Sequence, residues 1–180
     1  EIANGRDPGS VVAVWQRKSY GEENTFEHDL ALDSLELRRV LIAHADALGR
    51  RLRADQVHAR TVTLKLKLAR PLGGGRYPLV SRSSSLDDAT DDSAAIAKIA
   101  IALIARVTAR EKVRLAGIQV HNLERADSSQ LGLFDSPAGG AAKSARLNRA
   151  LDAVARRFGD EAVTRGLTHA ERAAPSRRVK

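Results

Sequence analysis

The sequence predicts an α+β domain made of two similar halves, with strands and helices in the order βαββαβ. Three observations predict this order. Polar and apolar residues alternate at 61–68, apolar residues have helical spacing near 37–52 and 96–107, and a glycine triplet at 73–75 can reverse the chain. A split repeat of this kind normally forms a four-stranded sheet with both helices on one face. We therefore expect a covered face, an open face and a C-terminal helical extension.

The first half contains a connector, a strand, a helix and a second strand. Residues 1–16 are rich in turn-forming pairs, which favours a connector. A strand is expected from Lys18 to Phe26, and a helix after it with Asp33 or Ser34 as the N-cap. The strand at 61–68 is the clearest, because every second residue is apolar and the residues between are Thr or Lys.

The second half repeats this order after the glycine triplet. A strand is expected from Tyr77 to about Ser85, and a helix from Asp92 or Ser93. The last strand is expected from Lys112 to Leu123, and Gly117 is expected to form a bulge at which the inward-facing positions change parity.

Residues 141–180 are expected to form a helical extension and a basic tail. Gly159 is expected to end the helix, since glycine is common after a helix C-terminus. The apolar positions of this helix are Leu147, Leu151, Val154 and Phe158.

The composition favours a polyanionic partner. The formal charge of the 180 residues is +8 and the isoelectric point is about 10.4, which points to nucleic acid before membrane. The alternative is a well-solvated, arginine-rich protein. There is no apolar run of the roughly 20 residues that a membrane span needs. The chain has no Cys, which excludes disulfides and thiolate chemistry and fits a cytoplasmic location.

The sequence shows no catalytic or metal-binding constellation. The five histidines lack His-x-x-x-His spacing. The pairs Asp87-Asp88 and Asp91-Asp92 are expected to precede and cap the second helix, where negative charge meets the positive end of the helix dipole. Because the chain opens at Glu1 without an initiator methionine, we expect it to be part of a longer protein whose active site lies elsewhere.

A basic, hydroxyl-rich surface is expected on the open face of the sheet. Long cations on a rigid sheet suit contacts to phosphates, which position a protein on nucleic acid without reading its sequence. The residues expected on this face are Thr61, Thr63, Lys65, Lys67, Arg82 and Arg114.

A short apolar peptide, Gln130–Phe134, follows the domain in polar surroundings. Leucine and phenylalanine are difficult to bury in such a linker, so we expect the peptide to dock into a pocket on a partner. The alternative is a turn folded back on its own domain. The peptide resembles the motif by which bacterial DNA polymerases attach to the ring-shaped sliding clamp, although Gly132 departs from the usual Ser or Asp.

Five segments together resemble the little-finger domain of Y-family translesion DNA polymerases, of the bacterial DNA polymerase IV type. The resemblance covers about residues 1–134, and Ser84 departs from it by replacing a common arginine. The segments are Lys18–Phe26, Arg60–Lys67, Leu79–Leu86, Val113–Ile118 and Gln130–Phe134.

The resemblance implies a division of the chain. Residues 1–16 would connect to a missing thumb and palm, 17–125 would bind DNA, 126–140 would carry the clamp-binding peptide, and 141–180 would extend the domain. The fragment would be monomeric and hold no cofactor, whereas the parent enzyme's palm would bind magnesium.

The resemblance also implies the binding residues. For primer-template duplex these are Arg17, Lys18, Ser19, Thr63, Lys65, Lys67, Arg82, Ser83, Ser84 and Arg114. For the sliding clamp they are Gln130, Leu131, Leu133 and Phe134. One alternative is a catalytically inactive homologue that acts as a clamp-bound adaptor. Another is an RNA- or single-strand-binding module, which would need aromatic residues on the open face.

Overall fold

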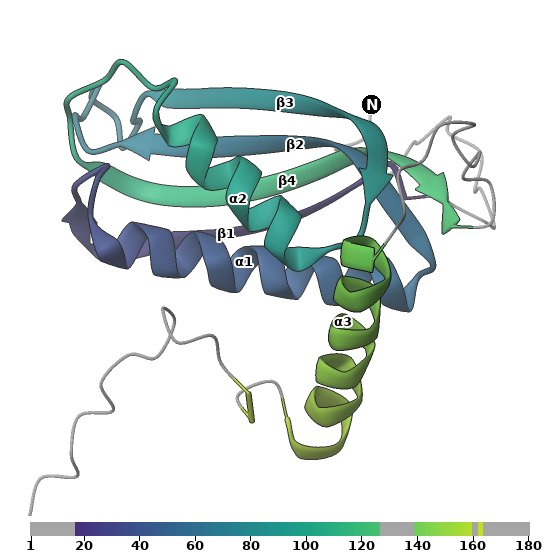
Figure 1. The fold of residues 1–180 in the computed structure, drawn as a ribbon. Coiled ribbons are helices and arrows are strands. Elements are labelled where there is room, and N and C mark those ends of the chain that lie inside the picture. Colours follow the sequence, from purple (N-terminus) through teal and green to yellow (C-terminus); the bar gives the residue numbers. More distant parts are fainter. Residues whose placement is uncertain (1–16, 127–138, 160–161, 164–180) are drawn as a thin grey trace, which may run out of the picture.

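The structure is a computed structural model that describes residues 17–126, 139–159 and 162–163. It confirms the α+β class and the βαββαβ order, followed by a C-terminal helix (Figure 1). The elements are β1 (Ser19–Leu30), α1 (Leu35–Ala54), β2 (Val57–Leu68), β3 (Leu79–Thr90), α2 (Ser93–Ile104), β4 (Val113–Arg125) and α3 (Gly139–Phe158).

The four strands form one antiparallel sheet in the order β1-β4-β2-β3. The two central strands are β2 and β4, and the edges are β1 and β3. Helices α1 and α2 lie side by side on one face, as expected (Figure 1). This arrangement buries one face of the sheet and leaves the other without a helix from the two repeats.

Alternation in β2 and β4 builds the core under the helices. Apolar residues of the two strands stand opposite each other on this face, in the pairs Val62–Val120, Leu64–Ile118 and Leu66–Ala116. Leucines of α1 and apolar residues of α2 complete the core; among them are Leu37, Leu41, Leu48, Leu52, Ile96, Ala100 and Leu103. The core therefore contains few aromatic residues, in keeping with an aromatic content of 3%.

The helix N-termini are capped as the sequence predicts. The Ser34 hydroxyl accepts a hydrogen bond from the backbone N–H of Leu37 at 3.2 Å. The Asp92 carboxylate accepts one from the N–H of Ala94, also at 3.2 Å. Each cap satisfies a backbone donor that the helix itself leaves unpaired.

The expected bulge at Gly117 is wrong. Gly117 pairs in regular register with Glu23 on one side and Lys65 on the other. The parity of β4 changes nearer its start, because both Val113 and Ala116 lie in the core and the register shifts across Arg114. Gly117 instead permits close approach of the strands, since a Cβ there would lie 2.6 Å from the Cβ of Glu23.

The glycine triplet reverses the chain between β2 and β3. Gly73, Gly74 and Gly75 have φ angles of 89°, 58° and 72°, which favour glycine. Backbone hydrogen bonds between Leu72 and Arg76 and between Arg76 and Gly73 close the turn. The predicted reversal is therefore confirmed.

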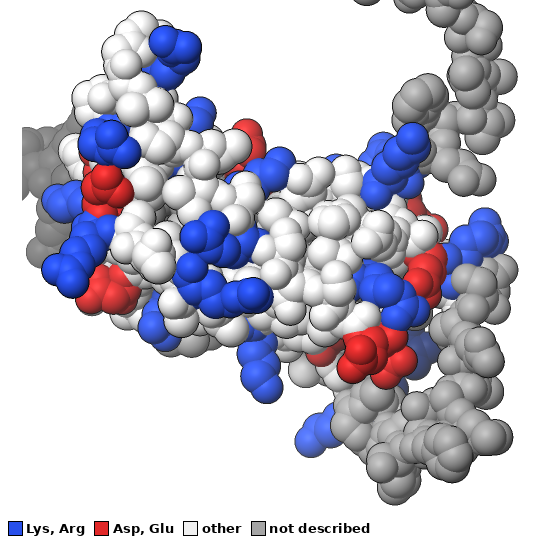
Figure 2. All heavy atoms as spheres, turned by 90° about the horizontal axis from the view of Figure 1, so that it is seen from above, with Lys and Arg blue, Asp and Glu red and all other residues white. Residues whose placement is uncertain are grey.

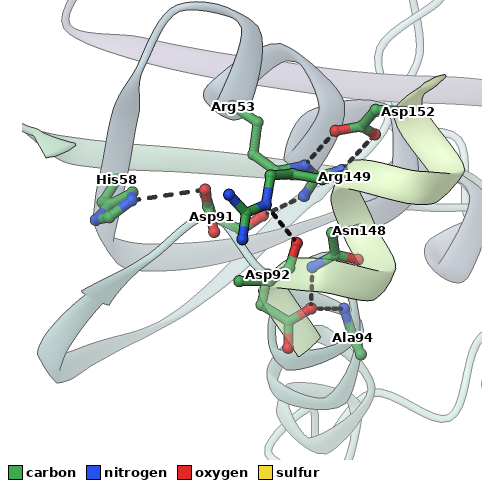
Figure 3. Close-up of polar contacts among 9 residues, drawn as sticks. Arg53, His58, Asp91, Asp92, Ala94, Asn148, Arg149 and Asp152 are labelled. Carbon is green, nitrogen blue, oxygen red and sulfur yellow. Dashed lines mark hydrogen bonds and ion pairs between the residues drawn. The ribbon is translucent and has the colours of Figure 1, made fainter. Parts of the chain in front are cut away.

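Helix α3 docks against α1 and the start of α2 through polar contacts (Figure 3). Arg53 of α1 donates from Nε and Nη2 to the two carboxylate oxygens of Asp152 at 2.6 and 2.9 Å. Asn148, which is 3% exposed, donates to Asp92 at 2.9 Å. Gly159 follows the helix with a φ of 91°, so the predicted end of α3 is confirmed. In the described segments, no helix has the length and apolarity that a membrane span requires.

Candidate nucleic-acid interface

The open face consists of the side chains that point away from α1 and α2. In β2 these side chains alternate with the core residues. Residues that pair with them in neighbouring strands lie on the same face, which identifies the open-face residues of the other three strands. The open face comprises Ser19, Gly21, Glu23 and Thr25 of β1, Leu115, Gly117, Gln119 and His121 of β4, Thr61, Thr63, Lys65 and Lys67 of β2, and Leu79, Ser81, Ser83 and Ser85 of β3.

Hydroxyl groups on this face are joined by hydrogen bonds across the strands. The hydroxyls of Thr61 and Ser85 lie 3.1 Å apart, and those of Thr63 and Ser83 lie 2.8 Å apart. The hydroxyl of Thr63 also lies 3.0 Å from Nε2 of His121. The threonines are almost buried beneath these partners, with Thr63 only 7% exposed. They therefore orient the outer side chains, and Ser83 and Ser85 are the groups that remain accessible.

Lys65 and Lys67 are the cations of the central strands on the open face. Two residues along a strand place their Cα atoms about 7 Å apart, on the same side. Lys65 stands between Gly117 and Ser81, where the lack of a side chain on glycine leaves a hollow of about 320 Å³. Gly21 and Glu23 also line this hollow. Lys65 is thus held at the edge of this hollow, whose lining residues also include Glu22.

The expectation that Arg82 lies on the open face is wrong. Arg82 stands opposite Leu64, a core residue, so its side chain leaves the sheet on the helix side. Its guanidinium donates to the carbonyl oxygens of Arg106 and Ser81, both at 2.9 Å. Ser84, opposite Val62, has the same parity. Because β3 is an edge strand with polar residues on both sides, its sequence does not reveal which parity faces outward.

Arg17 and Lys18 precede β1 and are exposed. The guanidinium of Arg17 lies 4.0 Å from the carboxylate of Asp55 and 5.5 Å from the centre of the Tyr20 ring. Burial, followed by the hydrogen bond to Asp55, raises the pKa of the Tyr20 phenol above its usual range. Tyr20 therefore remains neutral beside these charges, at the end of α1.

Arg114 lies at the irregularity of β4, outside the regular alternation of the open face. Its guanidinium is 3.8 Å from Asp29 and 4.9 Å from the centre of the Tyr77 ring. A carboxylate therefore partly offsets its charge.

Basic side chains also extend beyond the open face. Figure 2 looks down on the molecule from above the view of Figure 1, onto the side where β3 lies. Lysines and arginines are spread across this side, and the acidic side chains gather mainly toward its two ends. The arrangement is that of a protein surface that attracts polyanions.

The acidic pair Asp91-Asp92 beside α2 has structural partners. Asp91 lies 3.5 Å from His58, and its backbone carbonyl accepts from Arg53. Burial would raise the pKa of Asp92, but hydrogen bonds from Asn148 and from the N–H of Ala94 contribute to holding it below its ordinary range. Among residues 17–126, 139–159 and 162–163 there is no group of three or more His, Asp or Glu arranged to hold a metal ion.

Gln119 and His121 are among the polar residues of the open face that sequence reasoning missed. Gln119 donates to the Ser19 hydroxyl at 3.1 Å, and His121 bonds to Thr63. They alternate with the core residues Ile118 and Val120, and that alternation is the signal that would have found them. The peptide Gln130–Phe134 lies outside the described residues.

The chain is similar to several curated proteins named DNA polymerase IV. It is 32% identical over 164 residues to that of Desulfatibacillum aliphaticivorans, covering 90% of this chain and 39% of the relative. The protein of Streptomyces coelicolor is 35% identical over 147 residues, covering 79% and 28%. The protein of Brucella melitensis is 31% identical over 170 residues, covering 93% and 36%. The chain thus spans roughly two fifths or less of each of these relatives.

A family model described as the impB/mucB/samB family C-terminal domain matches residues 17–133. The match includes every strand of the sheet and both covering helices, and it ends before α3. Together with the relatives, it shows that this chain belongs to the impB/mucB/samB family and carries the C-terminal domain of a Y-family DNA polymerase.

Proposed function

We propose that this chain is the DNA-gripping and clamp-tethering part of an error-prone translesion polymerase, and that its open face lies along primer-template duplex. The observation that carries the proposal is a sheet face that no described helix covers, with Lys65 and Lys67 beside accessible serines. Relatives named DNA polymerase IV support the same function.

The chemistry of the face suits phosphates better than bases. A polymerase moves along any sequence, so its grip must depend on the backbone, which carries charge but no sequence information. Lys65 and Lys67 supply charge, and Ser81, Ser83 and Ser85 supply hydroxyl donors fixed by the strands. The rigid sheet holds these groups in place before binding, which reduces the entropy cost of ordering them.

The open face is poorly suited to single strands. Binding of unpaired bases depends on stacking against aromatic side chains. Tyr20 and Phe26, the two aromatic residues of β1, are only 3% and 8% exposed and belong to the core. We therefore favour duplex as the ligand.

The experiment compares two double variants that remove equal charge from different faces. Lys65→Ala with Lys67→Ala should weaken duplex binding on unrelated sequences. The slope of log affinity against log salt should decrease by about 0.9 for each phosphate that the protein no longer neutralises. The control is Arg82→Ala with Arg106→Ala on the helix side of β3, which should have the smaller effect. Equal losses from both pairs, or a larger loss from the arginines, would contradict the proposed orientation.

The clamp-binding role rests on the sequence of Gln130–Phe134. Apolar anchors that dock in a partner's pocket dominate the affinity of such peptides. A fluorescent peptide with this sequence should therefore bind the bacterial sliding clamp in an anisotropy titration. A peptide carrying Leu133→Ala and Phe134→Ala should lose binding, and equal binding by the two peptides would overturn the role.

Catalysis by the parent protein is part of the proposal. The described residues offer no cluster of carboxylates for the magnesium that nucleotidyl transfer uses, so we assign the catalytic metal to another part of the parent. In this scheme the chain supplies binding energy and position, and the chemistry takes place elsewhere.

A further inference from the structure

A second basic site lies on the helix side of the domain, between α1 and α3. It is a cleft of about 670 Å³, within the range of about 300–1,000 Å³ that is typical of ligand-binding clefts. We call it the arginine cleft. Its lining comprises Arg50, Arg51, Arg53, Arg149 and Arg156, the carboxylates of Glu22 and Asp152, and the small side chains Ala47, Ala54 and Ala155.

Positive charge exceeds negative charge in this lining. Among the described lining residues, five arginines face two carboxylates, an excess of three positive charges. Both carboxylates already have partners within the cleft, Glu22 with Arg51 and Asp152 with Arg53. Arg51 and Arg53 are thus engaged by these carboxylates, and we take Arg149 and Arg156 of α3 as the candidates for binding a ligand.

The cleft exists because α3 is docked. The paired hydrogen bonds from Arg53 to Asp152 hold α3 beside α1, and the bond from Asn148 to Asp92 holds it at the start of α2 (Figure 3). Helix α3 begins at Gly139, beyond the residues 17–133 that match the family domain. One wall of the cleft is thus an addition to the family domain, on the face opposite Lys65 and Lys67.

We propose that the arginine cleft binds an acidic, leucine-containing segment of another protein. Arginine presents a fork of donors that matches a carboxylate with two parallel hydrogen bonds. The three alanines leave room for aliphatic side chains between the charged walls. The site is independent of the proposed DNA surface, because the two lie on opposite faces of the sheet and can be occupied together.

Nucleic acid fits the cleft less well. A cleft of about 670 Å³ is too small to enclose a double helix, whose major groove alone is about 12 Å across. The lining residues that the structure describes include no aromatic side chain on which unpaired bases would stack. Charge together with small apolar side chains therefore favours a peptide.

The test is an anisotropy titration of the full 180-residue chain with a labelled peptide of about twelve residues, composed of Glu, Asp and Leu. Arg149→Ala with Arg156→Ala should weaken binding about tenfold or more, as expected when charge-assisted hydrogen bonds are removed. The matched control is Lys143→Ala with Arg146→Ala, which removes equal charge from α3 outside the cleft. It should change affinity by less than about twofold. Circular dichroism checks that both variants keep their helix content.

Further titrations test the charge of the peptide and the shape of the cationic side chains. A peptide with Gln and Asn in place of Glu and Asp should not bind. Arg149→Lys with Arg156→Lys should restore only part of the affinity, because lysine keeps the charge but lacks the forked donors of arginine. Lys65→Ala with Lys67→Ala should leave peptide binding unchanged, whether or not it weakens DNA binding. Equal losses from the cleft pair and its control, or tighter binding of a single-stranded oligothymidylate than of the peptide through Arg149 and Arg156, would overturn the proposal.

Discussion

The two faces of the sheet are made by the same strands and have opposite chemistry. On the helix side, Leu64 and Leu66 stand opposite apolar residues of β4 and are almost completely buried. One residue away along the chain, Thr63 and Lys65 belong to a face of hydroxyls and cations. Along β2, residues that stabilise the fold thus alternate with residues that we propose bind DNA. A substitution in this strand should therefore change either stability or DNA binding much more than the other property.

The largest expected effect comes from Leu64→Ala, which removes a core side chain that is 1% exposed. Loss of buried apolar volume should reduce the free energy of unfolding by about 2–5 kcal/mol. The adjacent Thr63→Ala should cost only about 1 kcal/mol, because it removes neutral hydrogen bonds and little apolar volume, and the exposed Ser83 can bond to water instead. Urea unfolding of both variants measures the contrast, and equal losses would mean that the two faces do not differ as described.

A second pair of variants tests the close approach of β1 and β4. A Cβ at Gly117 would lie 2.6 Å from the Cβ of Glu23 and 2.9 Å from the carbonyl oxygen of Glu22. Gly117→Ala should therefore reduce stability by about 1–3 kcal/mol. At Gly21 the nearest atom would be 3.7 Å away, so Gly21→Ala should be neutral or slightly stabilising. The melting temperatures of the two variants should separate clearly, and similar values would contradict the packing of these strands.

A third and smaller effect is a change of stability with pH, which should come from His44 of α1. Burial lowers the pKa of His44 below its ordinary value of 6.5, against the influence of Glu22 and of a backbone hydrogen bond at Ala116. The unfolded chain therefore takes up the proton more readily than the folded domain. The stability that neutral His44 contributes is fully present above pH 6.5 and is lost progressively as the pH falls below it.

The measurement for His44 is the unfolding free energy between about pH 7 and pH 5. His44→Gln removes the titrating group and should flatten the decline over this interval. The other described histidines remain in both proteins, so the difference isolates His44. A decline of the same steepness in the variant would show that the buried imidazole is not responsible.

The sequence predicted the element order and the core of β2, because alternation is clear when one face of a strand is buried. It misplaced Arg82, since β3 is an edge strand whose inward and outward positions are both polar. It also misplaced the change of parity in β4. Glycine suggested a bulge, whereas the register shift lies at Arg114 and depends on pairing with β2, which periodicity alone does not reveal.

The sequence also revealed α3 without revealing how it docks. The apolar stripe predicted the helix, yet Leu147 and Phe158, the first and last residues of that stripe, are 55% and 66% exposed. Asn148 and Asp152 provide hydrogen bonds to the domain, and their partners are distant in the sequence. Polar docking of this kind depends on tertiary geometry, so it could not be predicted from the spacing of apolar residues.

Two neighbouring residues of β3 with opposite parity provide the sharpest test of DNA binding by the open face. The natural chain has no cysteine, so Ser83→Cys and Ser84→Cys each introduce a single thiol. With a thiol-linked photocrosslinker and primer-template duplex, cysteine at position 83, on the open face, should crosslink to DNA severalfold more than cysteine at position 84. Equal yields, or a higher yield from position 84, would contradict the claim that duplex lies along the open face.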